Sequence, residues 1–146
     1  MKQQCMGDMT LNHKSVLVLD DEFDIVALIK QSLQKAGLHV YAFTDPLLAL
    51  EHFKLNCKHY ILVLSDVRMP GMDGFEFVRK LKEINSTTKV LLMSAFEINS
   101  NELSTALGSV KINGFIQKPL SLTELNSIIR SLVANEIKTS VWNHKN

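Results

Sequence analysis

The chain has 146 residues, of which 16 are basic and 15 acidic, and its net charge is +1 at pH 7. This length suits one domain with a full hydrophobic core and leaves little room for a second domain. The near-neutral charge argues against a nucleic-acid-binding surface. The N-terminus lacks the apolar stretch of a secretory signal, and the longest apolar run, residues 60–64, is too short to cross a membrane. We therefore expect a cytoplasmic protein.

The two cysteines, Cys5 and Cys57, have neither a CxxC spacing nor histidines at the intervals of a metal site. The sequence therefore favours two free thiols in a reducing compartment over a disulfide or a zinc site.

Residues 1–14 are polar and aperiodic, which predicts a flexible N-terminal tail. A continuous apolar run at 16–19 is typical of a strand buried on both faces of a parallel sheet. Apolar residues then recur at helical spacing up to Gly37, which stands where a helix C-cap belongs. A second strand is expected at 39–43. Thr44-Asp45-Pro46 then predicts a helix start, with Leu47, Leu50 and Phe53 on one face.

The same alternation continues to the end of the chain. Strands are expected at 60–64, 89–93 and 113–117, and the loop RMPGMDG follows the first of these three. Apolar residues at helical spacing predict a helix through Phe75 and Leu81, and a weaker helix at 101–109. A final helix is expected after the capping box formed by Ser121 and Glu124. From about 136 the periodicity is lost, which predicts a C-terminal tail. The sequence thus predicts one (βα)₅ domain at 15–135, with a parallel sheet covered on both faces.

Polar residues follow four of the five expected strands: Asp20 and Asp21, Asp66, Ser94, and Lys118. Because the carboxyl ends of parallel strands share one edge of a sheet, these groups should converge on one crevice. Each has an ordinary alternative when taken singly. An Asp caps a helix or forms a turn, a Ser belongs to a loop, and a Lys is solvated. Those alternatives do not explain the joint placement.

Three close carboxylates repel one another, and a bound cation relieves the repulsion. Oxygen ligands with no His or Cys nearby favour a hard ion, and Mg²⁺ combines carboxylates with water and a phosphate. A metal beside a carboxylate and a lysine suits phosphoryl transfer, in which Asp is a known covalent acceptor.

These segments resemble the receiver domains of two-component response regulators over roughly residues 14–134. The matching stretches are VLVLDDE at 16–22, ILVLSDVRMPGMDG at 61–74, LLMSA at 91–95 and GFIQKPL at 114–120. The resemblance implies a flavodoxin-like, doubly wound sheet with strand order 2-1-3-4-5, the arrangement for which a chemotaxis regulator of this family is a standard example.

The resemblance also implies roles at matching positions. Asp66 is the expected phosphoacceptor, Asp21 a direct Mg²⁺ ligand and Asp20 a ligand largely through water. Arg68 would offer its backbone carbonyl to the metal. Ser94 and Lys118 would bind the phosphoryl oxygens. Phe115 matches the aromatic switch position, and Pro119 implies a cis Lys–Pro bond.

The implied function is a phosphoacceptor switch. A sensor histidine kinase or a histidine phosphotransfer protein would phosphorylate Asp66, and a changed packing would then control an unknown downstream protein. The chain would catalyse only its own phosphorylation and dephosphorylation and would not otherwise be an enzyme. Neither nucleic acid nor a membrane is expected as a partner, and the kinase, the target and the signal are not visible in the sequence.

Two other functions compete with the switch. A phosphohydrolase with an Asp nucleophile commonly has a second Asp two residues later, where this chain has Arg68. An interaction module with a relic pocket would not need the complete set of polar residues.

The chain departs from the family pattern in its weak fourth helix and in an insert at 109–113. Arg68 and Phe96 each lie two positions beyond a site residue, and we hypothesise that they screen the phosphoryl group from water.

Overall fold

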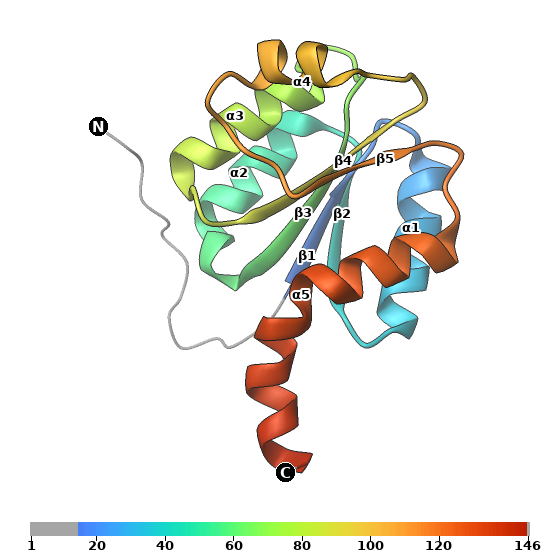
Figure 1. Ribbon diagram of the computed structural model, residues 1–146, viewed down its shortest axis with the longest axis vertical. Coiled ribbons are helices and arrows are strands. Elements are labelled where there is room, and N and C mark those ends of the chain that lie inside the picture. The colour runs from blue at the N-terminus through green and yellow to red at the C-terminus, as the bar shows by residue number, and fades with distance from the viewer. Residues whose placement is uncertain (1–14, 146) are drawn as a thin grey trace.

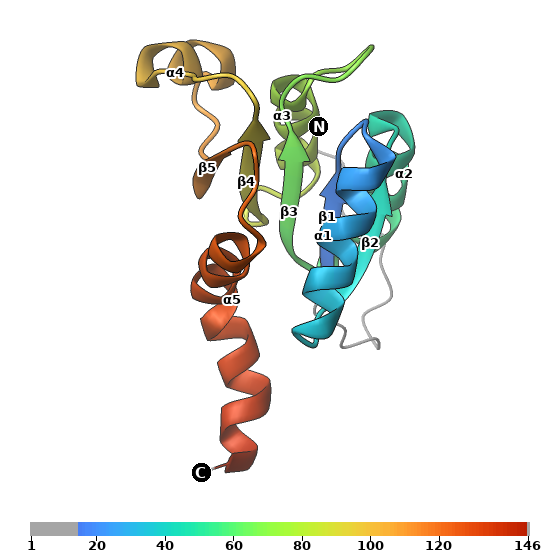
Figure 2. The same ribbon diagram turned by 90° about the vertical axis from the view of Figure 1, so that its right-hand side faces the viewer.

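The computed structural model describes residues 15–145, with side chains described for 15–134. Five strands form one sheet: β1 (Ser15–Leu19), β2 (His39–Phe43), β3 (Tyr60–Asp66), β4 (Lys89–Ser94) and β5 (Gly114–Gln117). All pairings are parallel, and the order across the sheet is β2-β1-β3-β4-β5, as Figure 2 shows. The predicted (βα)₅ fold and strand order are therefore confirmed.

A helix follows each strand along the chain. The helices are α1 (Phe23–Lys35), α2 (Pro46–Asn56), α3 (Gly74–Ile84), α4 (Ser100–Leu107) and α5 (Leu122–Lys145), and a short 3₁₀ helix, η1 (Cys57–His59), follows α2. Figure 1 shows all five packed around the sheet, with the last turns of α5 extending beyond it. No helix in the described part of the chain is long and apolar enough to span a membrane.

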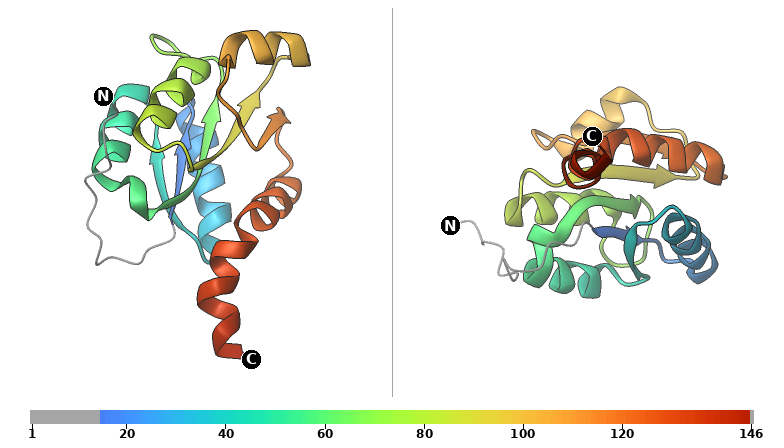
Figure 3. Two further views of the ribbon diagram at one scale, coloured as in Figure 1. Left: turned by 60° about the vertical axis from the view of Figure 1, so that its left-hand side comes forward. Right: turned by 90° about the horizontal axis from the view of Figure 1, so that it is seen from below.

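Successive residues of β1 point to opposite faces of the sheet, and each face has its own core. Leu17 and Leu19 pack with buried side chains of α2, α3 and α4, whereas Val16 and Val18 pack with those of α1 and α5. Figure 3 (left) shows α2 and α3 on one side of the sheet and α1 and α5 on the other. This two-sided burial explains why the strands are continuous apolar runs.

Local capping explains where several helices begin and end. Asp45, Asp73 and Asn99 each accept a backbone N–H at the start of α2, α3 and α4, at 3.0, 2.9 and 2.8 Å. Ser121 accepts the Glu124 N–H at the start of α5, as the capping box predicted. Gly37 follows α1 with φ +91°, a conformation that favours glycine.

The structure corrects two expectations about helices. Leu47 was expected on the buried face of α2, but it is 61% exposed, and Ala49 and Phe53 are the buried residues. Because α2 is apolar around most of its circumference, periodicity alone does not identify its inner face. Helix α5 continues to Lys145, although the apolar periodicity is lost near 136. The predicted N-terminal tail at 1–14 lies outside the described residues.

The expectation of a free thiol is wrong for Cys57, which is disulfide-bonded and fully buried. Cys5 lies outside the described residues. The spacing of cysteines along a chain does not show how close their sulfur atoms lie in the fold, and that distance decides whether a disulfide can form.

Gly74 holds the loop after β3 against the end of that strand. A Cβ atom at Gly74 would lie 2.2 Å from the Asp66 carbonyl oxygen and 2.8 Å from Val67 Cα. The Gly74 N–H donates to the Val67 carbonyl at 2.7 Å, which fixes this close approach. Since both clashing atoms belong to the backbone, a side chain at Gly74 must displace the segment that carries Asp66.

We predict that Gly74→Ala destabilises the fold by about 1–3 kcal/mol, the usual cost of overpacking a tight contact. It should also slow the phosphorylation that the resemblance leads us to expect at Asp66, because the segment that carries Asp66 moves. Gly37→Ala is the control, because it costs about 1 kcal/mol for its positive φ, meets no neighbouring atom and leaves the Asp66 segment intact. Urea unfolding and acetyl phosphate labelling measure the two effects. Equal labelling rates in the two variants would contradict the role given to Gly74.

Candidate metal and phosphoacceptor site

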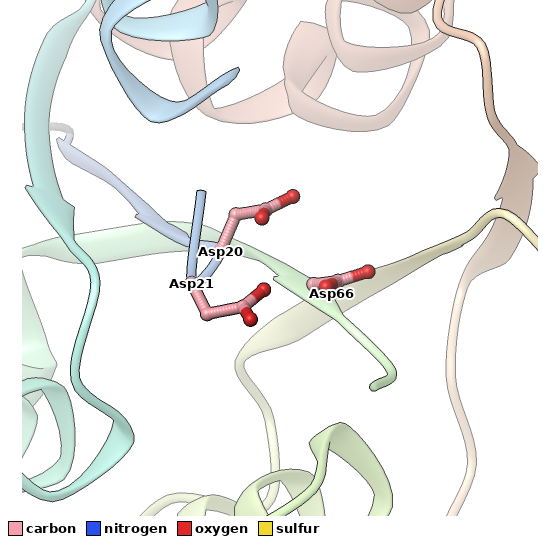
Figure 4. Close-up of side chains that lie close together, drawn as sticks. All are labelled: Asp20, Asp21 and Asp66. Atoms are coloured by element: carbon pink, nitrogen blue, oxygen red, sulfur yellow. The ribbon is translucent and has the colours of Figure 1, made fainter. Parts of the chain in front are cut away.

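Three carboxylates meet at the carboxyl edge of the sheet. Asp20 and Asp21 directly follow β1, and Asp66 is the last residue of β3. One oxygen atom from each lies within 4.8 Å of the others, and Figure 4 shows the three side chains next to one another. Asp20 and Asp66 are buried and Asp21 is exposed, so the cluster opens to solvent on the Asp21 side. The convergence expected from the strand ends is therefore present.

Asp20 is fully buried and forms an ion pair with Lys118, which follows the last strand of the sheet, β5. Lys118 Nζ lies 2.6 Å from Asp20 Oδ2, and the other oxygen, Oδ1, accepts the Glu22 N–H at 2.9 Å. The second contact is a turn bond to the residue two positions later, Glu22, which is the N-cap of α1 and has no side-chain cap. Both oxygens of this buried carboxylate therefore have a hydrogen-bond partner.

Asp66 shares the same lysine at a longer distance, with Lys118 Nζ 3.2 Å from Asp66 Oδ1. Burial is the main cause that raises the pKa of Asp66 to about 6; the charge of Asp20 raises it further, Lys118 partly opposes this, and Asp21 adds a smaller upward contribution. Burial alone would lower the pKa of Lys118, but its hydrogen bond to Asp20 and the charges of both carboxylates raise it overall. Lys118 therefore stays charged, and Asp66 is the carboxylate with the unfavourable charge.

The neighbouring strand ends are held to Asp66 by the backbone. The Val67 N–H donates to the Met93 carbonyl at 2.9 Å, and the Lys118 N–H donates to the Ser94 carbonyl at 2.7 Å. Ser94 thus lies at the end of β4, between the strands that bring Asp66 and Lys118. Its buried hydroxyl accepts the Phe96 N–H at 3.0 Å, and the Lys118–Pro119 peptide bond is cis, the conformation that the resemblance implied.

The loops after β3 and β4 touch beside the site. The Arg68 guanidinium carbon lies 4.3 Å from the centre of the Phe96 ring, a cation–π contact between the two loops. Phe96 is otherwise 52% exposed. Phe115, the expected switch aromatic, is half-buried against the core on the α2, α3 and α4 side.

The donor set fits a hard divalent cation. Three carboxylates supply oxygen ligands, and no His or Cys belongs to this cluster in the described residues. Burial first, and then the charges of Asp20 and Asp21, raise the pKa of Asp66 in spite of the nearby Lys118, and a cation bound here would favour the ionised carboxylate. Asp21, the exposed member, is the carboxylate best placed to meet an ion that keeps part of its hydration shell.

Sequence reasoning predicted that these residues converge but missed several of their contacts. It paired Lys118 with the phosphoryl group and did not anticipate that Asp20 holds it at 2.6 Å. It named Arg68 and Phe96 separately and did not predict that they touch. It also passed over Gly74, although a glycine that opens a helix right after a Pro/Gly loop is a signal of close backbone approach. The metal role of the Arg68 carbonyl stays a prediction.

Residues 16–130 match the family model of the response regulator receiver domain. The chain belongs to this family.

Relatives of this receiver domain differ widely in length. It is 38% identical over 125 residues to the sensor protein EvgS of Escherichia coli (strain K12), which covers 85% of the chain but 10% of EvgS. It is 32% identical over 123 residues to the response regulator receiver protein CpdR of Brucella abortus (strain 2308), which covers 83% of the chain and 98% of CpdR. The structure of the chemotaxis response regulator CheY4 of Vibrio cholerae matches with a TM-score of 0.70 and 28% identity, over 82% of this chain and 98% of that one.

The raised pKa of Asp66 predicts how stability depends on pH without metal. Because the folded pKa, about 6, exceeds the usual 3.8, Asp66 contributes stability that is present at low pH and lost as the pH rises through about 6. Between about pH 4 and pH 7.5, Asp66→Asn should therefore gain stability relative to the parent chain, by roughly 2 kcal/mol. Urea unfolding in EDTA at the two pH values measures this gain.

The control is Asp73→Asn, which neutralises an exposed carboxylate in the same loop and keeps a residue able to cap α3. It should show no comparable gain. Mg²⁺ should reduce the advantage of Asp66→Asn at the higher pH, because the cation stabilises the ionised parent. If Asp66→Asn and Asp73→Asn show the same pH dependence of the free energy of unfolding, the unfavourable charge assigned to Asp66 is refuted.

Proposed function

We propose that this receiver domain is a phosphoacceptor switch in a two-component pathway or phosphorelay, with Asp66 as the acceptor. The observation that carries the proposal is the shared contact of Lys118 with Asp20 and Asp66 inside a three-carboxylate cluster. Membership of the response regulator receiver family also supports the proposal. The donor would be a sensor histidine kinase or a histidine phosphotransfer protein, and the chain would act in the cytoplasm.

The proposed reaction is the transfer of one phosphoryl group. An Asp66 carboxylate oxygen attacks the phosphorus of a phosphohistidine, the P–N bond breaks, and the imidazole leaves as an aspartyl phosphate forms. Mg²⁺ bound by Asp21 and Asp66, with Asp20 acting through water, would neutralise charge on the transferring oxygens. Lys118, already within 3.2 Å of Asp66, would exchange part of its contact with Asp20 for a phosphoryl oxygen.

Ser94 would couple phosphorylation of Asp66 to the conformation of the β4–α4 loop. Its hydroxyl accepts the Phe96 N–H in the present structure, and the same hydroxyl would donate a hydrogen bond to a phosphoryl oxygen. A shift of Ser94 toward the new group would then strain or release the loop that begins at Phe96. The half-buried Phe115 on the adjacent strand would repack with that loop, and the downstream partner would recognise the altered face.

Labelling with a small phosphoryl donor tests the proposal. Acetyl phosphate with Mg²⁺ should add one phosphoryl group to the chain, and omission of Mg²⁺ or the change Asp66→Asn should abolish the addition, because each removes an essential part of the site. Intact-protein mass spectrometry reads out the added group. Asp73→Asn is the matched control and should label like the parent chain. Mg²⁺-independent labelling, or labelling of Asp66→Asn, would overturn the assignment, and turnover of small phosphoesters would favour a phosphohydrolase.

The contact between Arg68 and Phe96 predicts a slow loss of phosphate. Together these side chains would screen the phosphoryl group from attacking water, and an exposed cation–π contact is worth about 0.5–1 kcal/mol. Arg68→Ala and Phe96→Ala should each shorten the lifetime of the phosphorylated chain by about two- to fivefold. Decay of the phosphorylated species after removal of the donor measures the lifetime. The double variant should decay little faster than either single variant, since both lose the same contact, and an unchanged lifetime in all three would refute the screen.

A further inference from the structure

A groove borders the C-terminal half of α3, whereas the acidic cluster adjoins the start of that helix. This groove, of about 730 Å³, lies between α3 and the segment that follows α4. Helices α3 and α4 contact each other and lie side by side in Figure 1. Helix α3 begins at Gly74, against the Asp66 backbone, so its C-terminal half points away from the phosphoacceptor. The residues that carry the argument are Arg79, Lys82, Glu83, Leu107, Val110 and Lys111.

The rim of this groove carries an excess of positive charge. Arg79 and Lys82 line it from α3 and Lys111 from the opposite side, while Glu83 is the one carboxylate among its lining residues. The excess of two positive charges exceeds the net charge of the whole chain, which is +1. The salt bridges found among the described residues involve Lys80 and Lys118 and none of these three cations.

Two of the cations are held in place without being neutralised. Arg79 Nη1 donates to the Ala106 carbonyl at 2.5 Å, and Lys82 Nζ donates to the Thr88 and Ser86 carbonyls at 2.6 and 3.3 Å. Carbonyl oxygens orient these groups but carry no full charge, and the guanidinium keeps further N–H donors for a ligand. Burial lowers the pKa of Lys82, so an anion nearby would relieve an unfavourable charge.

The floor of the groove is apolar. Leu107 is buried and Val110 is half-buried, and both pack against the core on the α2, α3 and α4 side. Gly108, with φ +63°, turns the chain after α4, and the Val110 N–H closes the turn on the Leu107 carbonyl at 3.1 Å. This turn leads into the insert at 109–113, whose Ser109, Val110 and Lys111 form one wall of the groove.

We propose that the groove binds an acidic peptide segment of a partner protein, with an aliphatic side chain between two carboxylates. The aliphatic side chain would cover Leu107 and Val110, and the carboxylates would meet Arg79 on one wall and Lys111 on the other. A nucleic acid fits less well, because Glu83 would face its phosphates and the chain as a whole is nearly neutral. The proposal does not depend on the phosphoacceptor function.

The probe is a fluorescein-labelled peptide of alternating Asp and Leu residues, titrated with the full chain and followed by fluorescence anisotropy. Binding should be saturable, weaken with added salt, and shift the NMR signals of the amides at 108–111. Lys111→Glu, at an exposed position, should weaken binding about fivefold, and Glu83→Gln should tighten it. Lys35→Glu makes the same charge change at the distant end of α1 and should leave the affinity unchanged.

Asp66→Asn should bind the probe like the parent chain, which separates this test from that of the phosphoacceptor. The proposal is overturned if Lys35→Glu weakens binding as much as Lys111→Glu, because the attraction would then be diffuse. Equal binding of a peptide with Asn in place of Asp would show that the cations are not used. Tighter binding of single-stranded RNA or duplex DNA than of the peptide would assign the groove to nucleic acid.

Discussion

The ion pair of Lys118 with two aspartates makes the carboxyl edge of this sheet possible. Asp20 is fully buried and Asp66 nearly so, and two such carboxylates would be costly to keep side by side without a cation between them. Lys118 satisfies Asp20 closely and Asp66 less closely. The pKa of Asp66 is raised mainly because this carboxyl is buried and also because of the charge of Asp20, and the longer contact with Lys118 offsets this only in part.

The rest of the architecture serves to hold this arrangement in register. Parallel pairing places the ends of β1, β3 and β4 next to one another, and the backbone bonds from Val67 and Lys118 tie the following residues to the neighbouring strand. Gly74 lets α3 start close behind Asp66, and the Arg68–Phe96 contact joins the two loops that border the site. Asp66 therefore lies between the paired strands of the sheet and the two loops that the Arg68–Phe96 contact joins.

The fold was predictable because its signals are local and repeated. Each buried strand is an uninterrupted apolar run, and the caps at Asp45 and Ser121 mark helix starts that the structure confirms. The inner face of α2 was not predictable, because leucines surround that helix and only the fold decides that Leu47 stays outside. The bond state of Cys57 was missed for a similar reason, since it depends on a distance in space.

The candidate site was also predictable only in part. Strand-end positions were enough to predict that Asp20, Asp21, Asp66 and Lys118 converge, and the structure brings them together. The choice of Asp20 as the closer partner of Lys118 depends on burial and on fractions of an ångström, which no sequence pattern encodes. The groove beside α3 was equally hidden, because its cations come from a helix and from an insert that looked only like a departure from the family pattern.

Asp20 and Lys118 are 98 residues apart in the chain, and this separation links the chemistry to folding. Closing so long a loop is entropically unfavourable until the intervening strands have already paired. During synthesis the lysine emerges last, so a chain that carries Asp66 but has not yet added β5 lacks the compensating charge. The acidic edge is therefore complete only when the whole sheet is assembled, and an incomplete or misfolded chain would lack the lysine that joins Asp20 and Asp66.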